Sequence, residues 1–135
     1  MSEGQFPSKA DVVAWASKLY SEGVDRRDAR AYAAAFADDG WVQFGNNPPL
    51  VGPAAIEPAI ANFFTVMDTV SHKEIATTYC DGVLTLEAEV TYTVRGKTVT
   101  VPAASVYVMA RNTTPMAQIC RIYVDLAPLF AAAAG

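Results

Sequence analysis

Residues 83–110 read VLTLEAEVTYTVRGKTVTVPAASVYVMA, two alternating runs joined by a tight turn. In the first run, Val83–Val94, apolar side chains recur at every second position, and mainly threonines and glutamates lie between them. A period of two predicts a strand with one buried face. Arg95-Gly96-Lys97 predicts a hairpin turn, so we expect Thr98–Ala110 to return as the antiparallel partner strand.

The segments around this hairpin complete an α+β order. Further strands are predicted at Trp41–Phe44, His72–Cys80 and Ala117–Leu126. Apolar residues at helical spacing predict helices at Ala10–Gly23, at Asp28–Ala37 and from Gly52 to about Met67. Three helices before four consecutive strands with short connections indicate helices packed on an antiparallel sheet. We expect one domain over residues 10–130, with short tails at 1–9 and 131–135.

Composition limits the kind of partner. The chain has 135 residues, of which 52% are hydrophobic, and a net charge of −4. The apolar surplus predicts an internal cavity or a buried subunit interface. The absence of a basic run argues against nucleic acid, whose affinity depends on phosphate contacts. No segment reaches the roughly 18–20 apolar residues of a membrane span, and the N-terminus carries no signal pattern, so we expect a cytoplasmic protein.

The chain is poor in metal-binding side chains. Cys80 and Cys120 are expected to be free thiols, because two well-separated cysteines seldom pair in a reducing compartment. His72 is the only histidine, so a metal site would need carboxylates almost alone. We expect neither a metal nor another cofactor.

Several short sequence segments, in the order in which they occur, resemble the nuclear transport factor 2-like superfamily. They are Phe36-Ala37-Asp38-Asp39, the loop from Phe44 to Pro49, Gly52 with Ile56, Gly96, Pro102 and the run from Arg121 to Leu126. The SnoaL-like branch, with its polyketide cyclases, ketosteroid isomerases and limonene epoxide hydrolases, is the most similar in character. The resemblance implies a cone-shaped α+β barrel, in which three N-terminal helices pack on a curved antiparallel sheet. It also implies a pocket inside the cone and a homodimer formed through the outer sheet face.

The catalytic groups of two of these enzyme classes are not retained. By the resemblance, the ketosteroid isomerase base falls on Phe44, its acidic donor on Ala104 and its tyrosine donor on Tyr20. The charged trio of the epoxide hydrolases falls on Ala88, Val90 and Ile122, although Asn46 keeps one position that orients water. Without those charged groups, steroid isomerase and epoxide hydrolase chemistry are not expected.

The same comparison predicts the pocket wall. Even-numbered residues of the sheet are expected to face the cavity, joined by residues of the first and third helices and the first strand. The expected substrate-binding residues are Trp15, Phe44, Phe63, Ala88, Val90, Tyr92, Ala104, Val106, Cys120, Ile122 and Val124. Their apolar character predicts a ligand that is mostly hydrocarbon or aromatic. Strand alternation places Arg121, Tyr123 and Asp125 on the opposite face.

Three polar residues are the candidate catalytic groups, each with a structural alternative. Tyr20 is a proton donor or carbonyl polariser, or a buried tyrosine with a structural hydrogen bond. Asn46 points into the cavity mouth or forms a turn. His72, the one side chain that titrates near neutrality, assists catalysis or is structurally bonded.

These features leave three functions open. The first is a cyclase, isomerase or dehydratase acting on a polyketide- or terpenoid-like molecule mainly through shape and one tyrosine donor. The second is a non-catalytic protein that binds a hydrophobic metabolite. The third is a dimerisation module whose cavity has no role. We favour the first, because an apolar cavity with one phenol suits cyclisation.

Overall fold

The hairpin of residues 83–110 forms the centre of the sheet in the computed structural model, which describes residues 5–135. Strands β4 (Val83–Val94) and β5 (Lys97–Met109) pair from end to end, beginning with Val94 and Lys97 beside the turn. The other strands are β1 (Phe36–Phe44), β2 (Leu50–Val51), β3 (Thr69–Cys80) and β6 (Ala117–Val124). The helices are α1 (Lys9–Lys18), α2 (Ala29–Ala34), α3 (Pro53–Phe64) and α4 (Ala127–Ala134).

The six strands form one curved, open sheet in the order β2-β1-β6-β5-β4-β3. All neighbours are antiparallel except β1 and β6, which run parallel. The predicted α+β class and curved sheet are confirmed, but the sheet is not wholly antiparallel. The parallel pair is possible because most of the chain separates β1 from β6, which leaves room for a crossover.

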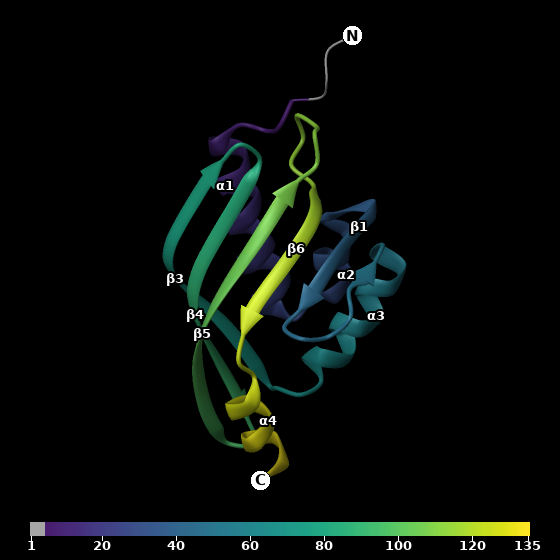
Figure 1. Ribbon diagram of the computed structural model, residues 1–135. Coiled ribbons are helices and arrows are strands. Elements are labelled where there is room, and N and C mark those ends of the chain that lie inside the picture. Colours follow the sequence, from purple (N-terminus) through teal and green to yellow (C-terminus); the bar gives the residue numbers. More distant parts are fainter. Residues whose placement is uncertain (1–4) are drawn as a thin grey trace.

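Helices cover the concave face of the sheet. In Figure 1, α1 lies behind β3 to β5, whereas α2 and α3 lie beside β1. A π-helical turn, Leu19–Gly23, and a 3₁₀ turn, Val24–Arg26, continue α1 toward α2. The core between the two layers includes several side chains with no exposed surface, among them Val12, Ile56, Leu84 and Tyr107. The curvature and this one-sided cover leave a hollow between α1, α3 and the sheet.

The second helix is shorter than predicted. Asp28 caps α2 by accepting a hydrogen bond from the Ala31 amide at 3.0 Å, but the helix ends at Ala34. Residues 36–40, which we expected to finish a helix and turn, belong to β1. Phe36 pairs with Ala117 of β6, so sheet pairing over a long sequence distance outweighs the local helical pattern.

Both predicted tails contribute to the fold. At the N-terminus, the Tyr79 hydroxyl donates a hydrogen bond to the Pro7 carbonyl at 2.8 Å, whereas residues 1–4 lie outside the described part of the chain. At the C-terminus, α4 buries Ala132, and the Arg95 guanidinium donates to the Ala133 carbonyl at 3.0 Å. The alanine-rich run is therefore a packed helix. None of the helices in the described chain has the length and apolar character needed to cross a membrane.

Candidate functional site

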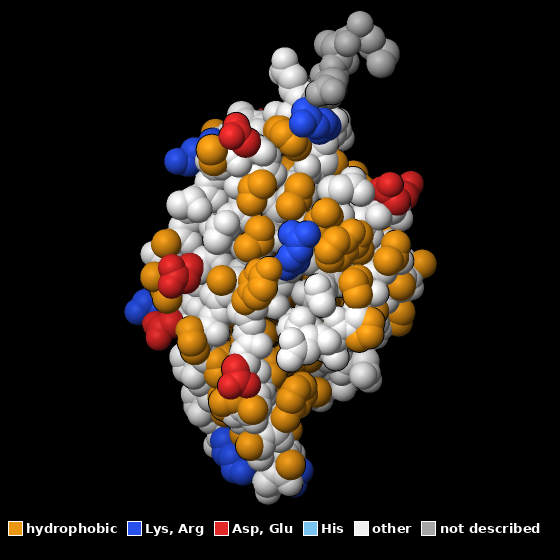
Figure 2. Space-filling model, in the orientation of Figure 1, with side chains coloured by type: hydrophobic (Ala, Val, Ile, Leu, Met, Phe, Trp, Pro, Cys, Tyr) orange, Lys and Arg blue, Asp and Glu red, His pale blue; other side chains and the backbone are white. Residues whose placement is uncertain are grey.

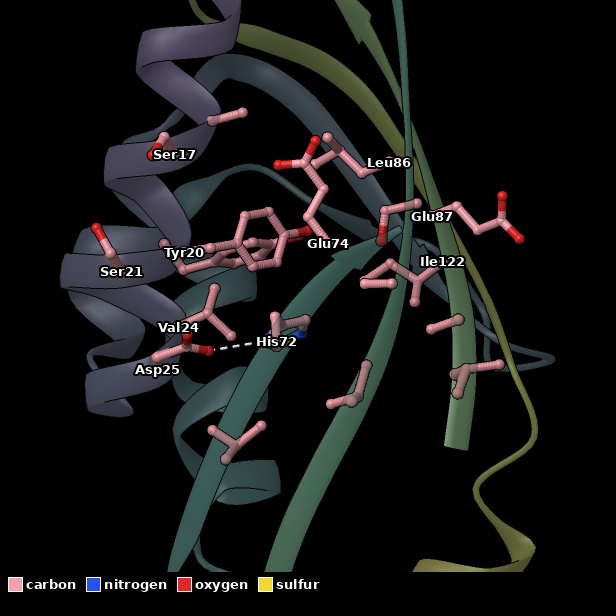
Figure 3. A pocket seen from close by; sticks show the side chains of 18 of the residues that line it. Ser17, Tyr20, Ser21, Val24, Asp25, His72, Glu74, Leu86, Glu87 and Ile122 are labelled. Carbon is pink, nitrogen blue, oxygen red and sulfur yellow. Dashed lines mark hydrogen bonds and ion pairs between the residues drawn. The ribbon is translucent and has the colours of Figure 1, made fainter. Parts of the chain in front are cut away.

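A cavity of about 340 Å³ occupies the hollow between α1, α3 and the inner face of the sheet. Figure 3 shows Tyr20 and His72 directed into this space from opposite layers, whereas Glu87 points away from it. Exposed Ser17 and Ser21 on the helical side and exposed Glu74 on β3 also belong to the lining, so the cavity opens to solvent between α1 and β3.

Most of the predicted wall residues line this cavity. They are Phe44, Phe63, Ala88, Val90, Tyr92, Ile122 and Val124. Their part in substrate binding stays a prediction. Two others lie just outside the lining: Trp15 packs edge-on against Tyr107 with 5.5 Å between ring centroids, and Cys120 is completely buried behind the wall.

The predicted face of β5 is wrong. Because the turn pairs Val94 with Lys97, each even-numbered residue of β4 lies opposite an odd-numbered residue of β5. Directly opposed residues point to the same face of an antiparallel pair. Ala104 and Val106 therefore lie on the outer face, and Ala103 and Ser105 line the cavity in their place.

In β6 the residues that face the cavity are again the even-numbered ones, because Ile122 pairs with Ser105 of β5. Arg121, Tyr123 and Asp125 accordingly lie outside the cavity, as their parity indicated. The Arg121 guanidinium carbon lies 5.3 Å from the centroid of the Trp41 ring, and 57% of Tyr123 is exposed. The Asp125 carboxylate accepts a hydrogen bond from the Ala127 amide at the start of α4.

Tyr20 belongs to a chain of buried hydroxyl and thiol groups. Its hydroxyl oxygen lies 2.7 Å from that of Tyr107, which lies 3.2 Å from that of Tyr32. The Tyr32 hydroxyl also lies 3.6 Å from the Cys120 sulfur. Two helical segments and two strands thus bring their polar atoms together. The sequence points to Tyr20 but not to Tyr107 or Tyr32, because no local pattern links Tyr20 to a partner 87 residues away.

Burial favours the protonated form of these hydroxyl and thiol groups. It is the main cause that raises the pKa of the Tyr20 hydroxyl, which the hydrogen bonds with Tyr107 and Ser105 only partly offset. Burial likewise raises the pKa of Tyr107 well above its ordinary value, and that of Cys120 to about 12. Near neutral pH these groups are therefore hydrogen-bond donors and not bases.

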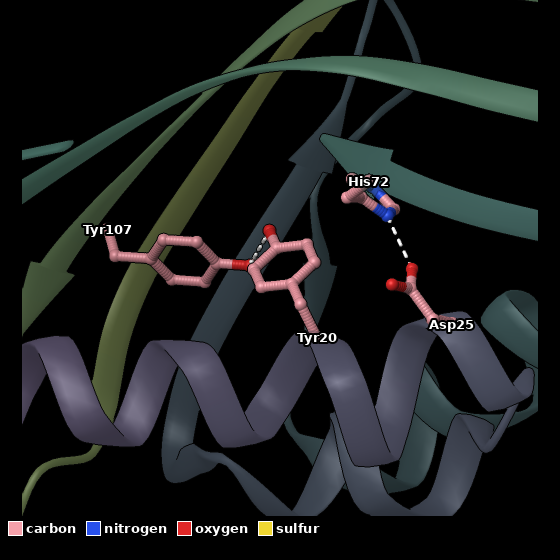
Figure 4. A network of polar contacts seen from close by, with 4 residues as sticks. All are labelled: Tyr20, Asp25, His72 and Tyr107. Carbon is pink, nitrogen blue, oxygen red and sulfur yellow. Dashed lines mark hydrogen bonds and ion pairs between the residues drawn. The ribbon is translucent and has the colours of Figure 1, made fainter. Parts of the chain in front are cut away.

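His72 forms a second polar group beside Tyr20. Its Nδ1 lies 2.7 Å from a carboxylate oxygen of Asp25, and its ring centroid lies 4.8 Å from that of Tyr20 (Figure 4). Both side chains of the pair are mostly covered, with 19% of His72 and 25% of Asp25 exposed. Asp25 was missed in the sequence, because no local pattern links it to a histidine 47 residues away.

The third catalytic candidate is not brought to the site. Asn46 is exposed in the turn after β1 and is absent from the cavity lining. Its neighbour Asn47 donates a side-chain hydrogen bond to the Phe44 carbonyl at 3.0 Å, as turn residues do. Among residues 5–135, no group of three or more histidine, cysteine or acidic side chains is arranged to hold a metal ion.

Known proteins are similar to this chain in sequence pattern and in fold. Residues 17–113 match the SnoaL-like domain family. The fold is similar to that of a Jannaschia sp. CCS1 protein assigned as a SnoaL-like polyketide cyclase, with a TM-score of 0.79 and 16% identity over 98% of this chain and 99% of that one. Among curated proteins, none is similar enough in sequence to count as a relative.

Two further structures show the range of this fold. One is a Catenulispora acidiphila protein with a ketosteroid isomerase-like fold in complex with trimethylamine, with a TM-score of 0.72, 18% identity and 94% of each chain covered. The other is an LEH-like epoxide hydrolase from M. tuberculosis, with a TM-score of 0.69 and 12% identity over 95% of this chain and 92% of that one. At such identities the likeness shows the fold alone, whereas the family match spans most of the chain. The protein belongs to the SnoaL-like domain family and has the nuclear transport factor 2-like fold.

Proposed function

We propose that this protein is an enzyme that moves a proton on a small hydrophobic ketone or related oxygenated molecule, in an isomerisation, cyclisation or dehydration. One observation carries the proposal: a tyrosine donor and a histidine-aspartate pair meet inside one apolar cavity. The ring centroids of Tyr20 and His72 are 4.8 Å apart, and both residues line the cavity. A donor and a base on the same substrate are what proton transfer next to a carbonyl requires.

The cavity wall selects a mostly apolar substrate. Apart from the polar groups near α1 and β3, the inner wall consists of side chains such as Val90, Phe63 and Ile122. A carboxylate or phosphate on the substrate would lose its hydration there without gaining a charged partner. A polyketide- or terpenoid-like molecule with an oxygen near Tyr20 satisfies both parts of the cavity.

Tyr20 is suited to hold the substrate oxygen. Its raised pKa keeps the hydroxyl protonated, so it donates a hydrogen bond to a carbonyl oxygen. When the neighbouring carbon loses a proton, negative charge moves to that oxygen and the same hydrogen bond becomes stronger. Tyr107, 2.7 Å from Tyr20, supports this donor and is a positioning residue because it does not line the cavity.

His72 is suited to carry the proton. A carboxylate only accepts, so Nδ1 carries the proton donated to Asp25, and in the proposed role Nε2 is the base. In the proposed step Nε2 takes a proton from the carbon beside the carbonyl, and the electron pair forms an enolate held by Tyr20. The protonated histidine returns the proton at another carbon or to a leaving hydroxyl. No oxidant or reductant is needed.

The proposal accounts for the apolar residues found where ketosteroid isomerases and epoxide hydrolases carry their charged catalytic groups. Proton abstraction needs a base, and Phe44 and Ile122 stand where the resemblance placed charged groups of other enzymes. In this chain His72 and Asp25 supply a base from β3 and the turn after α1. A protein that binds the same molecules without reaction is the alternative, because those apolar residues also suit a simple carrier.

Hydrogen exchange in heavy water tests the proposal. We would incubate the protein with a panel of hydrophobic ketones, including 2-tetralone, and follow deuterium entry beside the carbonyl by NMR. Tyr20→Phe and His72→Gln are each expected to slow the exchange by about 10²-fold or more, the usual contribution of one acid or base group. Ser17→Ala, at the mouth, serves as the control. Ketones that bind but exchange no faster than in buffer would establish the carrier instead.

A further inference from the structure

A second cavity, which is open to solvent, adjoins the first. It has a volume of about 330 Å³ and lies between α3, the loop after β1 and α4. Its own lining is mostly apolar and includes Pro49, Leu50, Ala59, Leu126 and Phe130. Three residues, Phe44, Ile60 and Phe63, line both cavities. The two spaces are therefore neighbours with a common wall.

Two aromatic rings form the centre of this wall. Phe44 at the end of β1 and Phe63 near the end of α3 have ring centroids 4.8 Å apart, which is direct contact. Phe63 also meets Tyr92 edge-on at 6.3 Å, so the ring pair is braced from the sheet side. Both phenylalanines are only half-buried, since each faces a cavity on either side.

The ring pair and the polar groups of the site stand on different parts of the cavity wall. Phe44 is on β1 and His72 is on β3, with β6, β5 and β4 between them. Four strand spacings of about 4.8 Å give roughly 19 Å between the two strands when measured along the curved sheet, and the distance across the cavity is shorter. A ligand whose oxygen is held near Tyr20 and His72, and whose hydrocarbon part stays inside the cavity, extends toward the phenylalanine pair.

We infer that Phe44 and Phe63 are the specificity-determining residues that limit the length of the ligand, and that the second cavity becomes an extension of the site when one of these rings is removed. The inference rests on the proposed function, because it assumes that the ligand's oxygen lies at Tyr20. It assigns the wild-type protein to compact hydrophobic molecules that end at the ring pair. Longer alkyl or polyketide chains are excluded by contact with the rings and not by polarity.

A ligand series measures this limit. The probes are 4-n-alkylacetophenones with alkyl chains of increasing length, and the readout is the dissociation constant from isothermal titration calorimetry. While the chain lies in the cavity, each added methylene strengthens binding by about fourfold. We expect this gain to stop in the wild type at the length where the chain meets the rings. In Phe63→Ala the gain continues over several further methylenes.

Two variants separate this account from a general loosening of the pocket. Ala59 lines only the second cavity, so Phe63→Ala combined with Ala59→Trp should restore the wild-type limit. Leu86 lines only the first cavity, away from the ring pair, so Leu86→Ala should leave the limit where it is. If Phe63→Ala does not fold, Phe44→Leu must shift the limit in the same direction.

The outcomes also distinguish this inference from the proposed function. An equal shift in Leu86→Ala, or no return of the limit with Ala59→Trp, would overturn the role of the ring pair while short ketones still bind. Failure of even the shortest ketones to bind would overturn the ligand pocket and this inference together. Binding with the expected length limit but without hydrogen exchange would support the inference and reject only the catalytic step.

Discussion

Tyr107 is the residue on which the polar interior of this protein depends. It has no exposed surface, and its hydroxyl lies within hydrogen-bond distance of both Tyr20 and Tyr32. A phenol has one proton to donate and two lone pairs to accept with, so when Tyr20 donates to a ligand, Tyr107 donates to Tyr20 and accepts from Tyr32. Removing this oxygen leaves Tyr20 without its nearest partner and changes how strongly Tyr20 donates to a ligand.

We therefore expect Tyr107→Phe to lower the exchange rate of a bound ketone by about tenfold, less than Tyr20→Phe, because only a supporting hydrogen bond is lost. The dissociation constant should change little, since Tyr107 does not line the cavity. Rates and dissociation constants measured on both variants check this. A rate for Tyr107→Phe equal to that of the wild type would contradict the supporting role.

The buried acids also predict how stability depends on pH. Burial raises the pKa of Cys120 from 9.0 to about 12, and that of Tyr107 above 10.0. The unfolded chain therefore loses these protons at lower pH than the folded chain, so stability is full below about pH 9 and falls above it. Each such group lowers the free energy of unfolding by about 1.4 kcal/mol per pH unit once its unfolded form is ionised.

Denaturant unfolding from about pH 8 to about pH 10 measures this decline. In Cys120→Ala one of the acids is absent, so the decline near pH 9 should be shallower than in the wild type. An equally steep decline in both proteins would show that Cys120 ionises freely in the folded state.

At the scale of single residues, the sequence points to Tyr20 and His72, which can be recognised without knowing their contacts. It does not point to the residues that they contact. His72 is the only histidine, and Tyr20 falls on a position that the family resemblance marks. Asp25 and Tyr107 meet them only through folding, over separations of 47 and 87 residues. No local pattern records such contacts.

Among the elements, β1 shows how long-range pairing replaces a local preference. The run before residue 38 has helical spacing, yet from Phe36 on it pairs in parallel with β6. The strand shifts register between Phe36 and Trp41, and a Cβ at Gly40 would lie only 2.9 Å from the Ala117 carbonyl oxygen. The alternation of β4 predicted its bounds well, because a period of two over twelve residues has no helical equivalent.

Gly40→Ala is accordingly expected to destabilise the protein by about 1–3 kcal/mol, the usual cost of overpacking. The added methyl group must push β6 away from β1. Denaturant unfolding of Gly40→Ala, with Gln43→Ala on the same strand as control, measures the effect. A smaller loss of unfolding free energy in Gly40→Ala than in Gln43→Ala would mean that β1 and β6 accommodate the methyl group without cost.

The C-terminal helix gives a second prediction for an element. Sequence analysis treated its alanines as a tail, because a uniformly apolar run has no periodicity to reveal a buried side. In the structure Leu129 is completely buried. We expect Leu129→Ala to cost about 2–5 kcal/mol of unfolding free energy, as for other core leucines. The exposed neighbour Phe130 provides the control, and thermal or denaturant unfolding of Leu129→Ala and Phe130→Ala compares them. A wild-type-like stability of Leu129→Ala would show that α4 does not pack in solution.

At the scale of the whole molecule, no helix among the described residues 5–135 covers the outer face of the sheet. Figure 2 shows hydrophobic side chains gathered on this face, over the strands at the front of Figure 1. Exposed Tyr123 lies on it, and Ala104, opposite Tyr123 in the neighbouring strand, shares the same side. We propose that two copies of the chain pair through this face.

Sedimentation measures this directly. We expect about twice the chain mass of 14.4 kDa for the wild type, and a shift to the mass of one chain in Tyr123→Asp, which places a charge in the interface. The fold of the variant is checked by circular dichroism. A wild-type protein that sediments at the mass of one chain would rule out the dimer.

The central claim is that Tyr20 and the His72–Asp25 pair act on one ligand in one cavity. Because His72 is the only histidine, the imidazole NMR signals of the protein belong to this residue alone. The most direct measurement is the nitrogen-15 spectrum of this ring, recorded without ligand and then with saturating 2-tetralone. The account predicts a proton on Nδ1, and a clear shift of Nε2 on binding that is reduced in Tyr20→Phe. A ring with its proton on Nε2, or an Nε2 signal unchanged by the bound ketone, would contradict it.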